Sequence, residues 1–285
     1  MLIKEASQKW NISERRIRKL IELGRINNAT KLGNIWTIPD DTSKPIDKRY
    51  KIEEEINYDI DENLFKEIES KLNLIYKSRF NDRHKMNNLK NKIDQAIIYH
   101  DNSYTKNRIN LNEIRIVLEG ITVPGKTIEE HLEITNYYQA IKYLENTRNI
   151  TEETIKDIYK ILKNRLSNNE ALYQNNNTKN LIDETIQNYN DLKEYHPLIA
   201  SAYLHGKILK IKPFQELNLK IAKLLLNCSL INNGYSPIII TKNDRFNYFD
   251  SIEEIINNND YTNLIKFITK KESEVLEEYI KIIKF

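Results

Sequence analysis

One stretch of the sequence, residues 211–223, combines the residue types that bind a phosphate group and a metal ion. It reads Ile-Lys-Pro-Phe-Gln-Glu-Leu-Asn-Leu-Lys-Ile-Ala-Lys, with apolar helical runs before it at 198–209 and after it at 221–230. A loop that enters a helix N-terminus presents free backbone N–H groups to an anion. We therefore expect an anion site here, with the oxygens of Glu216 and Asn218 available to Mg²⁺.

Three lysines of this stretch, Lys212, Lys220 and Lys223, place positive charge around the expected helix N-terminus. Their charge suits a phosphate group. A lysine side chain is ordinarily protonated at neutral pH, so it cannot take a proton from a hydroxyl as a histidine does. The residue types therefore favour anion binding, and none of the three lysines is suited to act as a general base.

The elements that position this stretch are expected to be helices. The chain has 285 residues but only 6 glycines and 6 prolines, which leaves few turns for a sheet protein. Apolar residues recur at spacings of three to four in the segments 63–99, 151–165 and 181–209. We predict a mainly α protein whose helical domain spans 63–285 and follows a linker at 44–62 and a smaller N-terminal domain at 1–43.

Charge, cysteine usage and hydropathy exclude several classes of protein. The net charge of +3 is mild, and no apolar run approaches the length of about 18 residues that spans a membrane. The single cysteine, Cys228, lies in an apolar helical run, so we expect a buried thiol in a reducing, cytoplasmic setting. The five histidines show no metal-ligand spacing, and no structural zinc is expected.

The N-terminal segment reads as two short helices followed by a β-hairpin. Residues 2–10 are helical in pattern, Ser13 is a candidate N-cap for a helix over 14–23, and Gly33-Asn34 between apolar pairs is a hairpin signal. This order resembles the winged helix-turn-helix modules of the excisionase and MerR type. The resemblance implies DNA binding through basic residues of the second helix and its end: Arg15, Arg16, Arg18, Lys19 and Arg25. A protein-docking module of the same fold, or a merely solvated basic helix face, are the alternatives.

Read residue by residue, the stretch 211–223 resembles the signature of the Fic (Fido) family, H-P-F-x-(D/E)-G-N-G-R-x-x-R. Pro213, Phe214, Glu216 and Asn218 match the pattern. The resemblance, which covers roughly residues 90–270, implies transfer of AMP from ATP to a protein hydroxyl. In the family the histidine is the general base, the acidic residue holds Mg²⁺, and the glycine backbone and the arginines hold the phosphates. The nucleotide-binding positions that it implies are Phe214, Glu216, Asn218, Lys220, Lys223 and Tyr248, with Mg²⁺ on Glu216.

The departures from this signature fall on the positions that carry its chemistry. Lys212 stands at the position of the histidine, Leu217 and Leu219 replace the glycines, and Lys220 and Lys223 replace the arginines. A leucine prevents the close backbone approach that glycine permits, and a lysine lacks the bidentate fork of arginine. We interpret the signature as degenerate on an intact fold, so that ATP and Mg²⁺ would meet a weakened site.

A second segment, 111–144, resembles the part of the Fic fold that precedes the signature. Within it, residues 121–128 are predicted as a β-hairpin, the flap that in the family aligns the target side chain; its tip is Thr122, Val123, Pro124 and Gly125. A plain surface hairpin is the alternative. Many members also carry an inhibitory helix, (S/T)-x-x-x-E-(G/N), whose Glu binds the second arginine. This chain has Asp101, Thr105 and Lys106 at those three positions, so no inhibitory Glu is expected to face Lys223.

Three functional interpretations follow. The first is a Fic-fold protein without AMP transfer that acts as a nucleotide- or partner-binding regulatory module coupled to DNA. The second is an active transferase of nucleotidyl or phosphoryl groups with altered chemistry. The third is a scaffold or dimeric transcription factor whose helical domain only oligomerises. The pattern predicts DNA as a partner and no membrane, and it leaves a protein target and a homodimer open.

Overall fold

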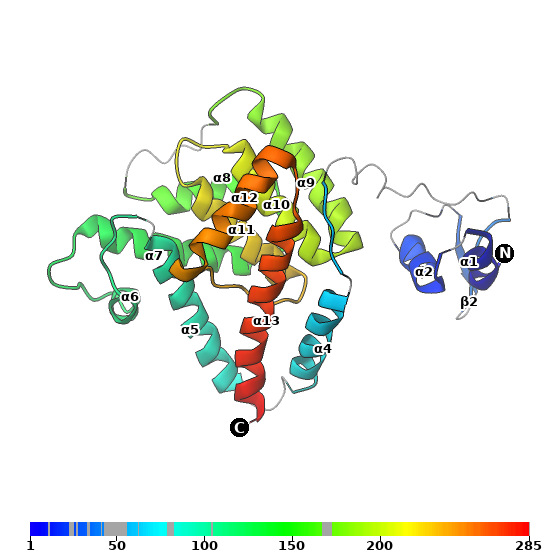
Figure 1. Cartoon of the computed structure of the whole chain (residues 1–285), viewed down its shortest axis with the longest axis horizontal. Helices are drawn as coiled ribbons and strands as arrows, with labels where there is room; N and C mark the ends of the chain where they lie inside the picture. The colour runs from blue at the N-terminus through cyan, green and yellow to red at the C-terminus, as the bar shows by residue number, and fades with distance from the viewer. Residues whose placement is uncertain are drawn as a thin grey trace. The chain divides into compact units, whose positions relative to one another are not determined.

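The computed structural model describes residues 1–10, 12–22, 26, 28–32, 35–40, 42, 56–61, 63–78, 83–103, 105–166 and 173–284. The chain divides into two compact units, Met1–Tyr50 and Lys51–Phe285 (Figure 1). Most of the linker expected at 44–62 lies outside the described residues.

The N-terminal unit contains two helices and a two-stranded antiparallel sheet. Its helices are α1 (Ile3–Trp10) and α2 (Glu14–Glu22), and its strands are β1 (Thr30–Leu32) and β2 (Ile35–Thr37), paired in the register Lys31 opposite Trp36. The two helices and the hairpin agree with the elements that the sequence predicts. They enclose a small core of their own, made of Ile3, Ala6, Trp10, Ile17, Leu20, Ile21, Ile26 and Ile38.

The larger unit is an array of helices. In chain order its elements are α4 (Asn63–Ser78), α5 (Arg83–Asn102), α6 (Leu111–Leu118), α7 (Ile128–Glu145), α8 (Glu152–Lys163), α9 (Thr178–Tyr195), α10 (Pro197–Ile211), α11 (Asn218–Asn232), the 3₁₀ turn η1 (Lys242–Asp244), α12 (Arg245–Asn258) and α13 (Thr262–Lys284). No helix of the described residues is long and apolar enough to cross a membrane.

Helix α10 is the centre of this array. It packs against α9, α11, α12 and α13, and nearly all of its residues are buried, because it is apolar on every side. At Gly206 an added Cβ would lie 2.8 Å from the ring of Tyr261 and 3.0 Å from Ile255. Glycine therefore permits the close approach of α10 to α12 and to the start of α13.

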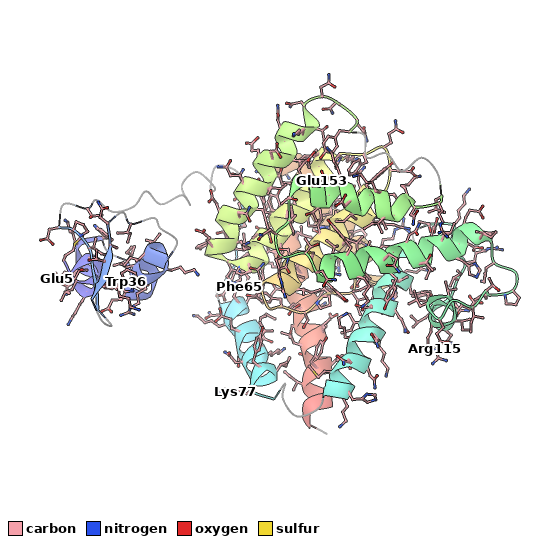
Figure 2. The ribbon with its side chains drawn as sticks, turned by 180° about the vertical axis from the view of Figure 1, so that it is seen from behind. Glu5, Trp36, Phe65, Lys77, Arg115 and Glu153 are labelled. Atoms are coloured by element: carbon pink, nitrogen blue, oxygen red, sulfur yellow. The ribbon has the colours of Figure 1, made fainter. Side chains whose placement is uncertain are left out.

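Helix α13 packs against both α4 and α5, and the three helices extend away from α10 in the same direction (Figure 1). The Lys71 ammonium on α4 donates to Ser273 at 2.6 Å and to Glu277 at 2.8 Å, both on α13. Phe65 lies near the start of α4 (Figure 2). Its ring stacks on His196 with centroids 3.8 Å apart. These contacts fix α4 to the helices that carry the candidate site.

The predicted β-hairpin at 121–128 is wrong, because the structure has a loop there. Residues 121–127 pair with no strand, and the only backbone bond within the segment runs from Lys126 N–H to the Val123 carbonyl at 3.3 Å. The Val123 N–H, which a hairpin would need, donates instead to His131 Nε2 at 2.9 Å. Thr127 forms the capping box of α7 with Glu130. The backbone groups of this segment therefore contribute to the start of α7 and do not form the hydrogen bonds of a hairpin.

Glu272 on α13 is a fully buried carboxylic acid. Its Oε1 accepts the Ser236 N–H at 2.8 Å, and no described residue bonds its Oε2. Burial raises the pKa of Glu272 from 4.5 to about 8. The folded state therefore holds this proton more tightly than the unfolded state, so its contribution to stability is full below pH 4.5 and is lost as pH rises toward 8.

We predict that Glu272→Gln, which imitates the protonated acid, leaves stability at pH 5 nearly unchanged. At pH 9 it should stabilise the protein by roughly 2–4 kcal/mol relative to wild type, because no buried charge then forms. Urea titrations followed by circular dichroism measure both values. Glu278→Gln, at an exposed position of the same helix, is the control, and equal effects of the two substitutions at pH 9 would contradict the prediction.

Candidate functional site

The stretch 212–217 forms the loop between α10 and α11, as the sequence predicts. Helix α10 ends at Ile211, and Lys212 follows it in the left-handed region at φ 48°. Leu217 precedes α11 and is also left-handed, at φ 66°. A non-glycine residue in this region costs of order 1–2 kcal/mol. The loop at Leu217 therefore keeps a backbone conformation that glycine adopts freely, although the residue is leucine.

Side chains hold the loop in one arrangement. The Asn218 amide binds both backbone groups of Phe214: its Oδ1 accepts the N–H at 3.0 Å and its Nδ2 donates to the carbonyl at 2.6 Å. The Gln174 N–H donates to the Pro213 carbonyl at 3.0 Å. The Phe214 ring is fully buried and stacks on Tyr159 with centroids 4.3 Å apart. The contacts of Phe214 and Asn218 thus stabilise the conformation of the loop itself.

Glu216 is the only carboxylate of the loop, and its side chain is 56% exposed. Its Oε1 accepts a hydrogen bond from the Lys163 ammonium on α8 at 2.5 Å. Mg²⁺ takes oxygen ligands in near-ideal octahedral geometry. Here an ammonium already occupies one carboxylate oxygen, and the backbone of Phe214 occupies the oxygen of Asn218. As folded, Glu216 keeps one carboxylate oxygen for a metal ion and Asn218 has its oxygen bonded to the loop, so the pair does not offer Mg²⁺ both of the ligands that the sequence predicts.

The two lysines at the arginine positions point into the core. Lys220 is 8% exposed and its Nζ donates to Asn102 Oδ1 at 2.6 Å. Lys223 is 3% exposed and its Nζ donates to Asp101 Oδ1 at 2.7 Å. Both partners lie in the last turn of α5. Burial lowers the pKa of Lys220. The two ammonium groups are therefore used to join α11 to α5.

Asp101, which stands at the serine position of the inhibitory pattern, is the partner of Lys223, and this pairing was not predicted from the sequence. Only the absence of an inhibitory Glu opposite Lys223 was expected. In the structure, Asp101 Oδ2 also accepts a hydrogen bond from the buried Tyr137 hydroxyl. An acidic residue of α5 thus does bind the lysine at the second basic position of the signature. In the sequence, this pair could have been anticipated only from the helix faces on which Asp101 and Lys223 fall.

Tyr248, which the resemblance assigns to the nucleotide, is completely buried. Its hydroxyl bonds His205 Nε2 at 2.8 Å, and its ring lies 5.5 Å from the Lys223 ammonium. Because the Ala222 carbonyl can only accept, His205 donates to it from Nδ1, at 2.9 Å, and accepts from Tyr248. Burial lowers the pKa of His205 to about 4, so the ring is neutral. As folded, Tyr248 presents no exposed face to a base.

The remaining predicted site residues lie at the surface or outside the description. Thr122, Pro124 and Gly125 are exposed, whereas Val123 is 8% exposed. Lys212 is exposed. In the N-terminal unit Arg18 is exposed and pairs with Glu14 at 3.0 Å, and Lys19 is exposed. The side chains of Arg15 and Arg16, and the whole of Arg25, lie outside the described residues.

No family model matches the sequence. Among curated proteins it is similar to "Protein adenylyltransferase Fic" of Nematostella vectensis, with 27% identity over 205 residues, 64% of this chain and 48% of the relative. It is also similar to "Protein adenylyltransferase fic-1" of Caenorhabditis elegans, with 24% identity over 211 residues, 66% of this chain and 41% of the relative. The chain therefore spans about half or less of the length of these relatives.

Two solved structures share the fold. One is a Fic domain containing signaling protein from Bacteroides thetaiotaomicron, with a TM-score of 0.70, 18% identity, and coverage of 78% of this chain and 98% of that one. The other is Fic-1 from Caenorhabditis elegans, with a TM-score of 0.69, 18% identity, and coverage of 77% and 72%. The larger unit therefore has the same mainly helical fold as these Fic structures, and its sequence is similar to curated Fic adenylyltransferases.

Proposed function

We propose that the helical unit is a Fic-fold regulatory module that does not transfer AMP, and that the N-terminal unit couples it to DNA. Phe214 and Asn218 keep the loop closed upon itself, and Glu216 is paired with Lys163. The module would act by binding a nucleotide or a protein partner, alone or as a homodimer.

The observation that carries this proposal is the inward position of Lys220 and Lys223. A phosphate group at the N-terminus of α11 would be bound more tightly if positive side chains faced the solvent side. Both ammonium groups instead bind α5 inside the core, and Lys223 faces a buried carboxylate. Withdrawing either one would leave a buried polar or charged partner without its bond, which is costly. These lysines are therefore poor phosphate ligands.

An altered transferase is the second candidate, because Lys212 and Glu216 remain exposed on the loop that enters α11. A positive charge and a carboxylate beside a helix N-terminus are a starting point for anion chemistry. A thermal-shift titration separates the candidates. Under the regulatory proposal, any stabilisation by ATP is unchanged in Glu216→Gln and does not require Mg²⁺. Stabilisation that needs both Mg²⁺ and Glu216 would favour the transferase.

We predict that the N-terminal unit binds duplex DNA through the basic face of α2. Arg15→Ala and Arg16→Ala should each weaken binding and lower the slope of log K against log salt by about 0.9, because each removes one phosphate contact. Fluorescence anisotropy with duplexes from an unbiased selection measures both quantities. Lys77→Ala, an exposed lysine of α4, is the control. Failure to select any duplex at low salt would contradict the prediction.

A further inference from the structure

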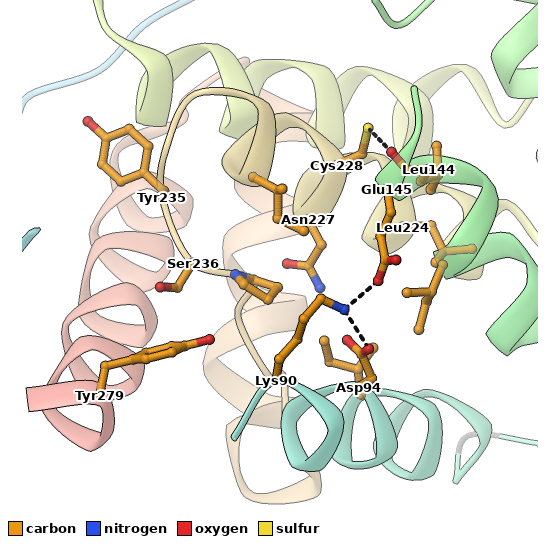
Figure 3. A pocket seen from close by; sticks show the side chains of 14 residues that line it. Lys90, Asp94, Leu144, Glu145, Leu224, Asn227, Cys228, Tyr235, Ser236 and Tyr279 are labelled. Atoms are coloured by element: carbon orange, nitrogen blue, oxygen red, sulfur yellow. Dashed lines mark hydrogen bonds and ion pairs between the residues drawn. The ribbon is translucent and has the colours of Figure 1, made fainter. Parts of the chain in front are cut away.

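A cavity of about 370 Å³ lies between the second half of α11, the middle of α5 and the end of α7 (Figure 3). This volume is at the small end of the range typical for small-molecule sites. Ile97, Ile141, Leu144 and Leu224 make much of its wall apolar, and the Cys228 thiol lies at its edge. Burial raises the pKa of Cys228 to about 12, so the thiol adds apolar, polarisable surface and no charge.

The polar groups of the cavity are two carboxylates and their lysines. The Lys90 ammonium donates to Asp94 at 2.9 Å and also to Glu145, and Figure 3 shows it between the two. Lys142 lies 3.7 Å from Asp94 and 2.9 Å from Glu145. The Asn227 amide binds both backbone groups of Ile238. The neutral side chains of Tyr235, Ser236 and Tyr279 also line the wall, so among the lining residues the two carboxylates are the charged acceptors that a ligand can engage.

The carboxylates are fixed and their present partners can move. Asp94 is 6% exposed and Glu145 is 26% exposed, whereas Lys90 is 39% exposed and stands on a long, flexible stem. Lys90 can move into solvent only by giving up its bonds to both carboxylates, which a ligand ammonium would have to replace, whereas Asp94 is held in the core. A ligand ammonium can thus take the place of the Lys90 ammonium between Asp94 and Glu145, with its apolar body along the wall. A ligand anion would have to displace a carboxylate.

We propose that this cavity binds a small amphipathic amine, with the ammonium on Asp94 and Glu145 and the apolar part beside Cys228. The site lies along the second half of α11, while the signature loop lies before its first turn. The proposal is independent of whether the loop binds a nucleotide.

The test uses three probes of similar shape: 2-phenylethylamine, 2-phenylethanol and 3-phenylpropionate. Dissociation constants come from NMR chemical-shift titrations of the full chain. We expect the amine to bind wild type about tenfold more tightly than the alcohol, because its ammonium replaces the charge-assisted bonds of Lys90 and the alcohol hydroxyl cannot. In Glu145→Gln the amine should lose this advantage, because two lysines then face one carboxylate. The control Glu119→Gln, at an exposed position outside the cavity, should keep it.

A second variant tests the location. Cys228→Met carries a longer side chain into the cavity and should raise the dissociation constant of the amine by about tenfold or more. Circular dichroism checks that the variant is folded. Equal binding of amine and alcohol to wild type, preference for the carboxylate, or no binding of any probe would each overturn the proposal. Undiminished amine binding in a folded Cys228→Met variant would also overturn it.

Discussion

Asp101→Ala should lower the free energy of unfolding of the helical unit by about 3–5 kcal/mol, the usual cost of leaving one partner of a buried ion pair alone. Asp101 and Lys223 side chains are 5% and 4% exposed, with their charged atoms 2.7 Å apart. Removing the carboxylate leaves the Lys223 ammonium in the core and also strips the Tyr137 hydroxyl of its acceptor. Both groups would then lack a bond that water cannot easily replace.

Two further variants show whether the loss comes from the buried charge. The double variant Asp101→Leu with Lys223→Leu removes both charges and should cost clearly less than Asp101→Ala, because no charge is left unpaired. Glu278→Ala breaks an exposed pair with Lys281 and should leave stability nearly unchanged. A cost below about 1 kcal/mol for Asp101→Ala would contradict the structural role of the pair.

Circular dichroism at 222 nm is the suitable signal for these measurements. The chain has two tryptophans, Trp10 and Trp36, and both lie in the N-terminal unit. Tryptophan fluorescence would therefore follow the smaller unit, whereas the helical signal comes mainly from the larger one.

Lys212→His should fail to produce AMP transfer. Restoring a general base is worth about 10²–10⁴-fold where the rest of a site is present. Here Leu217 and Leu219 still stand where the backbone would meet phosphate, and the two signature lysines remain bound to α5. The measurement is self-labelling with [α-³²P]ATP and Mg²⁺. Label on Lys212→His that wild type lacks would show that the base alone was missing.

Restoring transfer requires changes at the α5 contact as well. The residues that follow the family pattern are introduced by Lys212→His, Leu217→Gly, Leu219→Gly, Lys220→Arg and Lys223→Arg. With Asp101 in place, an arginine at 223 would again be held by a carboxylate, so these five changes should still give little label. Adding Asp101→Ser frees that arginine and keeps a hydroxyl for Tyr137, and this combination should label itself. Equal labelling with and without the Asp101 change would contradict the inhibitory effect of that carboxylate.

Much of the fold could be predicted because its signals are local. The apolar spacing predicted the helices, and Thr151 caps the start of α8 through a capping box with Thr154. The loop before Asn218 followed from the change of pattern on either side of it. The flap was not predictable in this way. Its extended residues could pair as strands, but the Val123 N–H donates to His131 of the next helix. Strand propensity contains no information about such a contact.

The state of the site depended on contacts between residues far apart in sequence. Lys220 and Asn102 are separated by 118 positions, and Lys223 and Asp101 by 122. Whether a lysine at the start of α11 faces solvent or core is decided by the residue that α5 places opposite it. The sequence identified the lysines as unusual for the signature, but only the packing of α5 on α11 showed what they bind.

The proposed absence of AMP transfer can be measured by incubating wild type with [α-³²P]ATP, Mg²⁺ and a cell extract. We predict no label on the protein itself or on any other protein above the level of a control in which Glu216→Gln replaces wild type. Label that appears with wild type and is absent with Glu216→Gln would contradict it, because the exposed carboxylate would then be supporting transfer.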